Sequence, residues 1–391
     1  MASNKKASLA TKPFVLVCLA AALGYMNQWV LVPVIPLYVD DLGASALVAG
    51  LVLLAFAIPS VVVRPVLGRL IDKWGSAIVV AMGLVAISAG ALLMLAPLLA
   101  MLFVGNAVRG LGWAGVNTGA YTMLAITAPV ERRGEASGYF SAVLTTVMIA
   151  FPVLGLWLLE HSGFSGTLVV AMLFSLLGLP VVVGLMKIQQ RPEPEPGPAA
   201  GGAGLLDRSV LLPSAINLCN SLVYPALMAF LPLYARSLGV EDIAWFYVIA
   251  GIAGIFLRPL LGKQSDAIGR GPSIAIILTA QLAGLVLIMF AQGLGQILAG
   301  GVLVALSTAM IGSIATALAI DMSDQRYRGR AMATFGMSFQ LGAGVGAVIS
   351  GALADFVGFR GMYAGCAVIT LAGLVALALA WKSLPPRPQR G

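Results

Sequence analysis

The chain repeats itself. Three short motifs of its first half return in the second half, each 194 to 196 residues further on. They are RPVLG at 64–68 and RPLLG at 258–262, PLY at 36–38 and at 232–234, and Arg133-Gly134 and Arg328-Gly329. A repeat with so long a period predicts two related halves with the same internal architecture.

The low charge content excludes a soluble globular protein. Of the 391 residues 60% are hydrophobic and 10% are charged, against about 25% charged residues in a soluble domain. A membrane-spanning helix needs about 20 apolar residues, and twelve such stretches can be counted. They lie near 13–38, 46–67, 76–97, 100–127, 136–159, 165–187, 209–235, 243–262, 273–292, 294–320, 331–354 and 361–382.

The basic residues give this topology an orientation. With twelve spans, 20 of the 23 Lys and Arg residues lie on one side; Arg236 and Arg360 lie on the other, and Arg109 lies within a span. Cytoplasmic loops carry the excess of Lys and Arg, so both termini are predicted to be cytoplasmic in a multi-pass protein of the cell membrane. The net charge of +8 then reflects topology, and no nucleic-acid partner is expected.

A segment rich in Pro, Glu and Gly divides the chain. Residues 188–206 cannot continue a helix or pack into a core. We therefore expect an N-terminal bundle of six helices over 1–187, a cytoplasmic linker over 188–206 and a C-terminal bundle of six helices over 207–391.

The fourth span carries the clearest candidate for a ligand contact. Asn106, Arg109, Trp113 and Asn117 follow a spacing of three, four and four, which places them on one helix face. An Arg at this depth is costly and normally faces a cavity or a partner. We expect Arg109 to line a substrate path; the alternative is a structural role in hydrogen bonding.

Polar stripes on other spans suggest further contacts. They comprise Tyr25 and Gln28 on the first span, Asn217, Asn220 and Tyr224 on the seventh, and Thr308, Gly312 and Thr316 on the tenth. Hydrogen bonding between helices explains such stripes equally well.

No acid is expected at the middle of the membrane. All 15 Asp and Glu residues fall toward the ends of the predicted spans, although proton-coupled transport normally uses a buried titrating group. Either a carboxylate at the rim, with Asp40, Asp41 and Asp72 as candidates, carries the coupling, or there is no proton coupling. One His and three separated Cys residues give no basis for a metal site, a cofactor or an enzyme.

The segment from Gly68 to Gly75 resembles the loop signature of the major facilitator superfamily, with Gly68, Asp72, Lys73 and Gly75 at matching positions. The resemblance implies an all-α fold of twelve transmembrane helices in two pseudo-symmetric six-helix bundles, which work by alternating access. It also implies that the first, fourth, seventh and tenth helices line the cavity, and that Asp72 binds the N-terminus of the eleventh. The implied gating residues are Gly68, Arg69, Asp72, Lys73 and Gly75, with Gly262, Asp266 and Asp321 in the second half.

Two departures from the family pattern concern charge. The signature usually continues with basic residues after its second Gly, but Ser76 and Ala77 follow here. Asp321 stands where the family often carries an acid, whereas its first-half counterpart is Ile126. The first half is therefore expected to lack part of the usual charge relay.

The closest pattern within the family is the drug/proton antiporter branch. Pro152 and Gly155 of its fifth-helix signature are present, while Phe151 and Leu156 replace glycines. The leading hypothesis is a monomeric secondary transporter that exports small amphipathic or drug-like molecules in exchange for protons. The alternative is a facilitator or exchanger of a small anionic or zwitterionic metabolite bound through Arg109.

Overall fold

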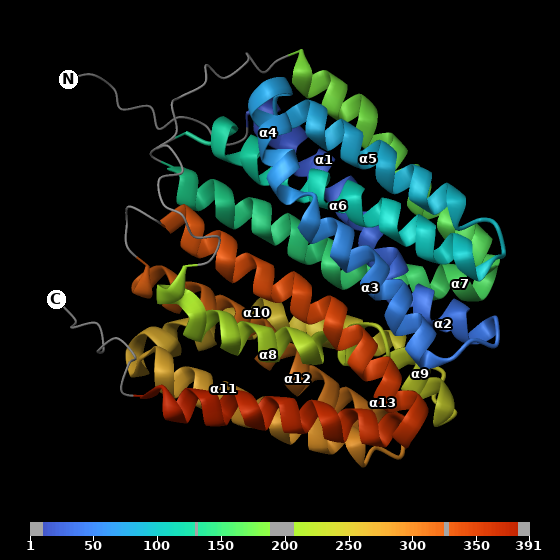
Figure 1. Cartoon of the computed structure of the whole chain (residues 1–391), viewed down its shortest axis with the longest axis vertical. Coiled ribbons are helices and arrows are strands. Elements are labelled where there is room, and N and C mark those ends of the chain that lie inside the picture. Colours follow the sequence, from blue (N-terminus) through green and yellow to red (C-terminus); the bar gives the residue numbers. More distant parts are fainter. Residues whose placement is uncertain (1–10, 130–131, 188–206, 324–327, 382–391) are drawn as a thin grey trace. The chain divides into compact units, whose positions relative to one another are not determined.

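The structure is a computed structural model, and it describes residues 11–129, 132–187, 207–323 and 328–381. Within these ranges the side chains of 133, 208, 258–266, 328–330 and 333 are not described. The described chain is helical (Figure 1). Its elements are α1 (Lys12–Leu31), α2 (Val34–Asp41), α3 (Ala46–Val62), α4 (Arg64–Trp74), α5 (Ser76–Leu93), α6 (Leu99–Thr127), α7 (Arg133–Met186), a short 3-10 turn (Arg208–Val210), α8 (Leu211–Met228), α9 (Leu231–Ser237), α10 (Ala244–Ile268), α11 (Arg270–Met289), α12 (Leu294–Met322) and α13 (Arg328–Leu379).

These helices make up the twelve predicted spans. Eight helices are long and apolar enough to cross a membrane, and α3 with α4, bent by 48°, forms a ninth span. The two longest helices each contain two spans, because α7 breaks at Gly163 and α13 at Gly358. The apolar first part of α10, Ala244–Leu257, completes the count. The prediction of an all-helical twelve-span fold is confirmed.

The sharp turns of the two halves are the same. Six glycines have a positive φ, and no other described residue does. They form three pairs at the period of the sequence repeat: Gly43 and Gly239, Gly75 and Gly269, Gly163 and Gly358. A residue with a Cβ rarely adopts this conformation, so the repeat preserves the backbone turns that follow the first, second and fifth spans and their second-half equivalents.

The signature segment differs from the predicted loop. Residues Arg64–Trp74 form helix α4, and Pro65 stands in its first turn, where the missing N–H costs nothing and the fixed φ favours a helix. Gly68 lies inside this helix, and a Cβ there would meet no atom within 4 Å. The turn after this helix is made by Gly75, with φ 90°.

The chain's contacts divide it into two compact units. The first comprises residues 1–31 and 58–200, and the second comprises 32–57 and 201–391. In the first unit α1 packs along α7 and α5 along α6; in the second, α8 packs along α13 and α11 along α12. We call residues 32–57 the arm. By its contacts the arm belongs to the second unit, together with the second half of the sequence. The predicted bundle boundary at the linker stays a prediction, since the linker lies outside the described residues.

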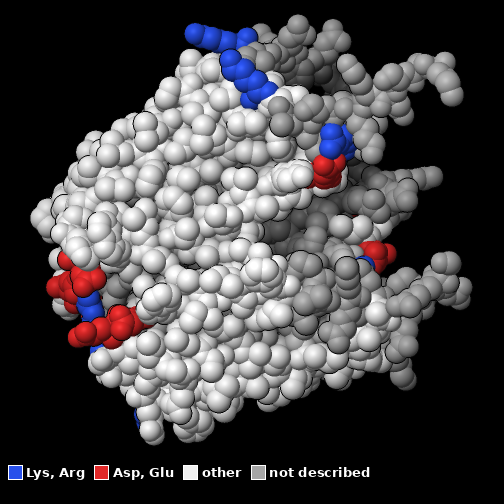
Figure 2. Space-filling view, turned by 180° about the vertical axis from the view of Figure 1, so that it is seen from behind, with Lys and Arg blue, Asp and Glu red and all other residues white. Residues whose placement is uncertain are grey.

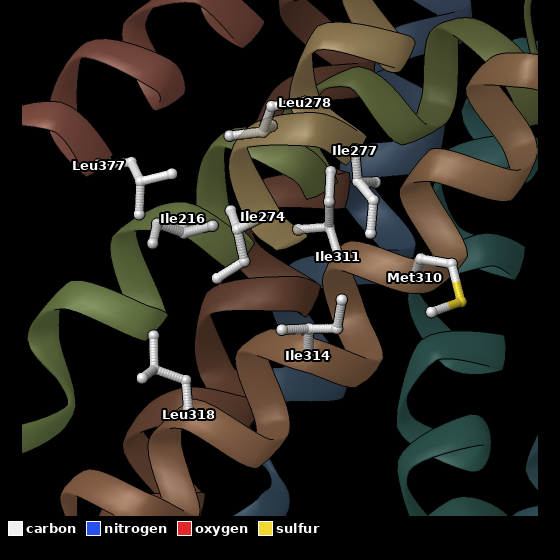
Figure 3. Close-up of a cluster of buried hydrophobic side chains, with 9 residues drawn as sticks. All are labelled: Ile216, Ile274, Ile277, Leu278, Met310, Ile311, Ile314, Leu318 and Leu377. Atoms are coloured by element: carbon white, nitrogen blue, oxygen red, sulfur yellow. The ribbon is translucent and has the colours of Figure 1, made fainter. Parts of the chain in front are cut away.

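The core of the second unit is aliphatic. Figure 3 shows a cluster in which α8, α11, α12 and α13 each contribute side chains, with Ile274, Ile311 and Leu318 fully buried. On the face that Figure 2 shows, the described charged side chains lie near the margins and leave a broad uncharged area between them. Large exposed side chains such as Phe256 and Val368 fit a surface that faces lipid.

Candidate substrate site

Arg109 lies at the centre of a polar cluster inside the first unit. The side chain is 1% exposed. One terminal nitrogen donates to Asn106 Oδ1 at 2.7 Å, and the other donates to Gln28 Oε1 at 3.0 Å and to Asn27 Oδ1 at 3.3 Å. The predicted pairing of Arg109 and Asn106 on one face of α6 is thus observed. All three acceptors are neutral amides, so none of them compensates the guanidinium charge.

Asn27 was not among the predicted site residues. It is fully buried on α1, and its Nδ2 donates to the backbone oxygen of Ala171 on α7 at 2.7 Å. The Arg109 cluster therefore joins α6, α1 and the second span of α7. An amide next to Gln28 in an apolar helix was a signal, although its face of α1 could not be assigned from spacing alone.

A second group on the same two helices is aromatic. The rings of Tyr25 and Trp113 lie 4.5 Å apart at 53°, and Asn117 Nδ2 donates to the Tyr25 hydroxyl at 2.7 Å. Tyr25 and Trp113 are buried, and Asn117 is half-buried. All six residues predicted for this half of the site therefore fall into two adjoining groups between α1 and α6.

Glycines allow the arginine to fit between α5 and α6. A Cβ on Gly90 would lie 2.5 Å from Arg109 Cγ and 2.5 Å from the Gly105 carbonyl oxygen. Earlier on α5, at the same interface with α6, a Cβ on Gly83 would lie 2.6 Å from the Gly112 carbonyl oxygen. Small residues permit this backbone contact between membrane helices, and Gly90 also leaves room for the arginine's aliphatic stem.

The second unit holds a smaller amide cluster. Asn220 on α8 donates to the Thr308 backbone oxygen on α12 at 3.1 Å. Gln281 of α11 is fully buried, and its Nε2 lies 3.4 Å from both Asn220 Oδ1 and Thr308 Oγ1. Sequence reasoning missed Gln281, because it is a lone amide on a span without a polar stripe.

The remaining predicted residues of this half lie toward α13. Asn217 donates to Ser338 Oγ at 3.0 Å, and the ring of Tyr224 meets Phe339 edge-on at 5.6 Å. The two units share one pattern of contact. Asn220 stands 195 residues after Tyr25, and Thr308 stands 195 residues after Trp113. Tyr25 contacts Trp113 in the first unit, and Asn220 hydrogen-bonds to Thr308 in the second.

Comparison with known proteins settles the family. The profile described as Major Facilitator Superfamily matches residues 17–294 and 214–391. The chain belongs to the Major Facilitator Superfamily. It is accordingly a multi-pass membrane protein and a secondary transporter of small molecules, in a family of transporters and not of enzymes.

Relatives extend over nearly the whole chain at low identity. An uncharacterized MFS-type transporter of Methanocaldococcus jannaschii is 25% identical over 87% of this chain and 90% of its own length. The staphylopine export protein of Staphylococcus aureus is 23% identical over 96% and 97%. The quinolone resistance protein NorA of Staphylococcus aureus is 24% identical over 91% and 93%.

A solved structure supports the fold. The crystal structure of the nucleoside transporter NupG matches this one with a TM-score of 0.76 at 12% sequence identity, over 94% of this chain and 99% of that chain. At this identity the likeness to NupG concerns the superfamily fold alone.

The signature residues of this superfamily member lie at the end of α4. Arg69, Asp72 and Lys73 are exposed, and Lys73 Nζ lies 5.7 Å from the Trp74 ring centre. Among the described side chains Asp72 has no ion pair. Its predicted partner lies at the start of the eleventh span, where residues 324–327 and the side chains of 328–330 are outside the description. The side chains of Gly262 and Asp266 on α10 are outside it too.

Asp321, at the end of α12, forms an ion pair with Arg270, the first residue of α11. Its carboxylate lies 3.4 Å from Arg270 Nε, so the ends of α11 and α12 are joined. Counting back through the repeat, Arg270 corresponds to Ser76 and Asp321 to Ile126. The two departures noted in the sequence are thus one difference: the first half lacks both members of a pair that the second half retains.

Proposed function

We propose that this transporter exports small amphipathic or drug-like molecules in exchange for protons by alternating access. The observation that carries the proposal is the relationship to two named efflux proteins, the staphylopine export protein and NorA, over more than nine-tenths of the chain. The buried Tyr25 and Trp113 rings add support, because an apolar and aromatic lining with few polar groups suits amphipathic ligands.

Arg109 favours a second candidate, transport of a small anionic or zwitterionic metabolite. Its guanidinium hydrogen-bonds three neutral amides, and a guanidinium is a group that binds a carboxylate or phosphate through two parallel hydrogen bonds. Because the Arg109 side chain is only 1% exposed, a ligand would have to displace one of the amides to reach the guanidinium. If a ligand replaced an amide in this way, Arg109 would bind anions and would not bind cations.

Transport assays in proteoliposomes separate the two candidates. Export predicts movement of a cationic dye that stops when the pH gradient is collapsed. The anion candidate predicts movement of organic anions, lost in Arg109→Met, with no movement of the dye. If neither dye nor anions move, both candidates fail.

The proposal includes a topology and an assembly. Both termini and the linker face the cytoplasm, the bundles comprise 1–187 and 207–391, and the monomer is the transporting unit. Labelling of single cysteines from either side of the membrane tests the orientation, and an externally labelled linker would refute it.

A further inference from the structure

Asp355, near the end of the first span of α13, binds the start of a helix from the other end of the sequence. Its Oδ1 accepts a hydrogen bond from the Ala46 backbone nitrogen and its Oδ2 accepts one from that of Leu47, both at 2.9 Å. All three residues belong to the second unit, because α3 starts within the arm.

This carboxylate completes the N-terminus of α3. The first N–H groups of a helix have no partner within it, and a Ser before the helix normally satisfies one of them. Ser45 Oγ does so for Val48 at 3.4 Å, and Asp355 takes the two that remain in the first turn. A negative charge there also meets the positive end of the helix dipole.

Glycines bring the two backbones into contact along the same interface. A Cβ on Gly351 would clash with the carbonyl oxygen of Ala46, and one turn further along a Cβ on Gly50 would clash with that of Ala347. Asp355 lies one turn beyond Gly351, so its position follows from this packing. The contact continues beyond residues 46–50 and 347–355, because a Cβ on Gly344 would lie 2.5 Å from Ala57 Cβ.

An ion cluster lies just before Ala46 in the arm. Arg236, at the end of α9, lies 2.7 Å from Asp41 and 3.1 Å from Asp40, the last two residues of α2. The three side chains are 46% to 51% exposed. Exposed ion pairs of this kind are weak and screened by salt, so they can break and form again.

The two ends of the arm differ. Its first residue, Val32, lies in the interruption between α1 and α2. Its last residue, Ala57, lies within α3, two residues before Pro59.

We propose that Asp355 and the Arg236 cluster form a latch that holds the arm to the second unit and is released once in each transport cycle. The inference rests on the alternating-access part of the proposed function and on no choice of substrate. With both termini cytoplasmic, the latch lies on the outer side.

Hydrogen exchange of the full-length protein in lipid nanodiscs tests the latch. Wild type is compared with Asp355→Ala, with Asp355→Asn, which keeps one acceptor oxygen, and with Asp242→Asn as a control at an exposed acid of the α9–α10 loop. We expect Asp355→Ala to raise exchange at least tenfold in both 46–57 and 344–355, Asp355→Asn to raise it less, and the control to match wild type. Adding Arg236→Gln to Asp355→Asn should bring exchange to the Asp355→Ala level.

Two outcomes would overturn the proposal. Faster exchange confined to Ala46 and Leu47 would reduce Asp355 to a local helix cap, and unchanged exchange in Asp355→Ala would remove its role altogether. If Asp355→Ala does not fold, the comparison of Asp355→Asn with and without Arg236→Gln decides. No substrate enters the measurement, so a failure of the latch is distinguishable from a failure of the proposed transport activity.

Discussion

Replacing Gly90 by Ala adds a single methyl group where α5 meets α6. The new Cβ would lie 2.5 Å from the Gly105 carbonyl oxygen and 2.9 Å from the Arg109 backbone nitrogen. Ordinary van der Waals contact begins at 3.4 Å, about 0.9 Å more than the 2.5 Å to the Gly105 oxygen. The two helices must therefore separate by a substantial part of this difference. The Gly83–Gly112 contact on the same interface resists this separation, because its atoms also belong to the backbone.

The expected cost follows from two opposing terms. Overpacking a tight interior costs about 1–3 kcal/mol, and two backbone neighbours that cannot rotate away place this site at the upper end. Ala favours a helix over Gly by about 1 kcal/mol, which leaves a net loss of about 2 kcal/mol. For a unit of this size each kcal/mol corresponds to about 2–4 °C, so the unfolding midpoint should fall by about 4–8 °C. Arg109 Cγ must also move, so transport should fall with it.

Gly68→Ala is the matched control. Nothing lies within 4 Å of a Cβ at this helical position, so the same substitution should raise stability by up to about 1 kcal/mol. Thermal unfolding in detergent, followed by tryptophan fluorescence, compares both variants with wild type. If Gly90→Ala unfolds at or above the wild-type temperature, as Gly68→Ala should, the close approach of α5 and α6 and the space argument for Arg109 are wrong.

Three further changes probe other contacts. Arg270→Ala should cost no more than about 1 kcal/mol because its ion pair is partly exposed to solvent, and exchanging Arg270 and Asp321 for one another should restore the unfolding midpoint; a larger loss, or no restoration, would speak against the pair. Tyr25→Phe removes the acceptor of Asn117 and should cost about 1 kcal/mol while raising KM for transport; an unchanged KM would place Tyr25 outside the site. Gln281→Leu should unfold within about 1 kcal/mol of wild type, because it loses only two 3.4 Å bonds and removes an oxygen without a partner among the described residues; a loss above about 2 kcal/mol would contradict this.

Hydropathy located the spans well because each must bury about 20 apolar residues in lipid. The predicted span 100–127 corresponds to α6, Leu99–Thr127. The bend between α3 and α4 was not predicted, since apolar length says nothing about helix direction. The glycines and charges of the signature segment predict a loop, whereas Pro65 starts a helix there.

The candidate site was predictable only along single helices. The spacing on α6 placed Asn106 and Arg109 together, as the structure does. Asn27 escaped notice because its contact with Arg109 joins residues 82 positions apart, and no periodicity within one helix encodes such a contact. The contact of Asp355 was not predictable either, since its partners are backbone amides more than 300 residues away.

The arm also has a consequence for how the protein is made. Residues 32–57 leave the ribosome long before any of residues 201–391, the part of the chain with which they pack. Through most of synthesis the helix start at Ala46 and the bare backbone at Gly50 must therefore be covered by lipid, water or the insertion machinery. Final assembly of the N-terminal spans is thus a late event, completed only after translation has reached α13.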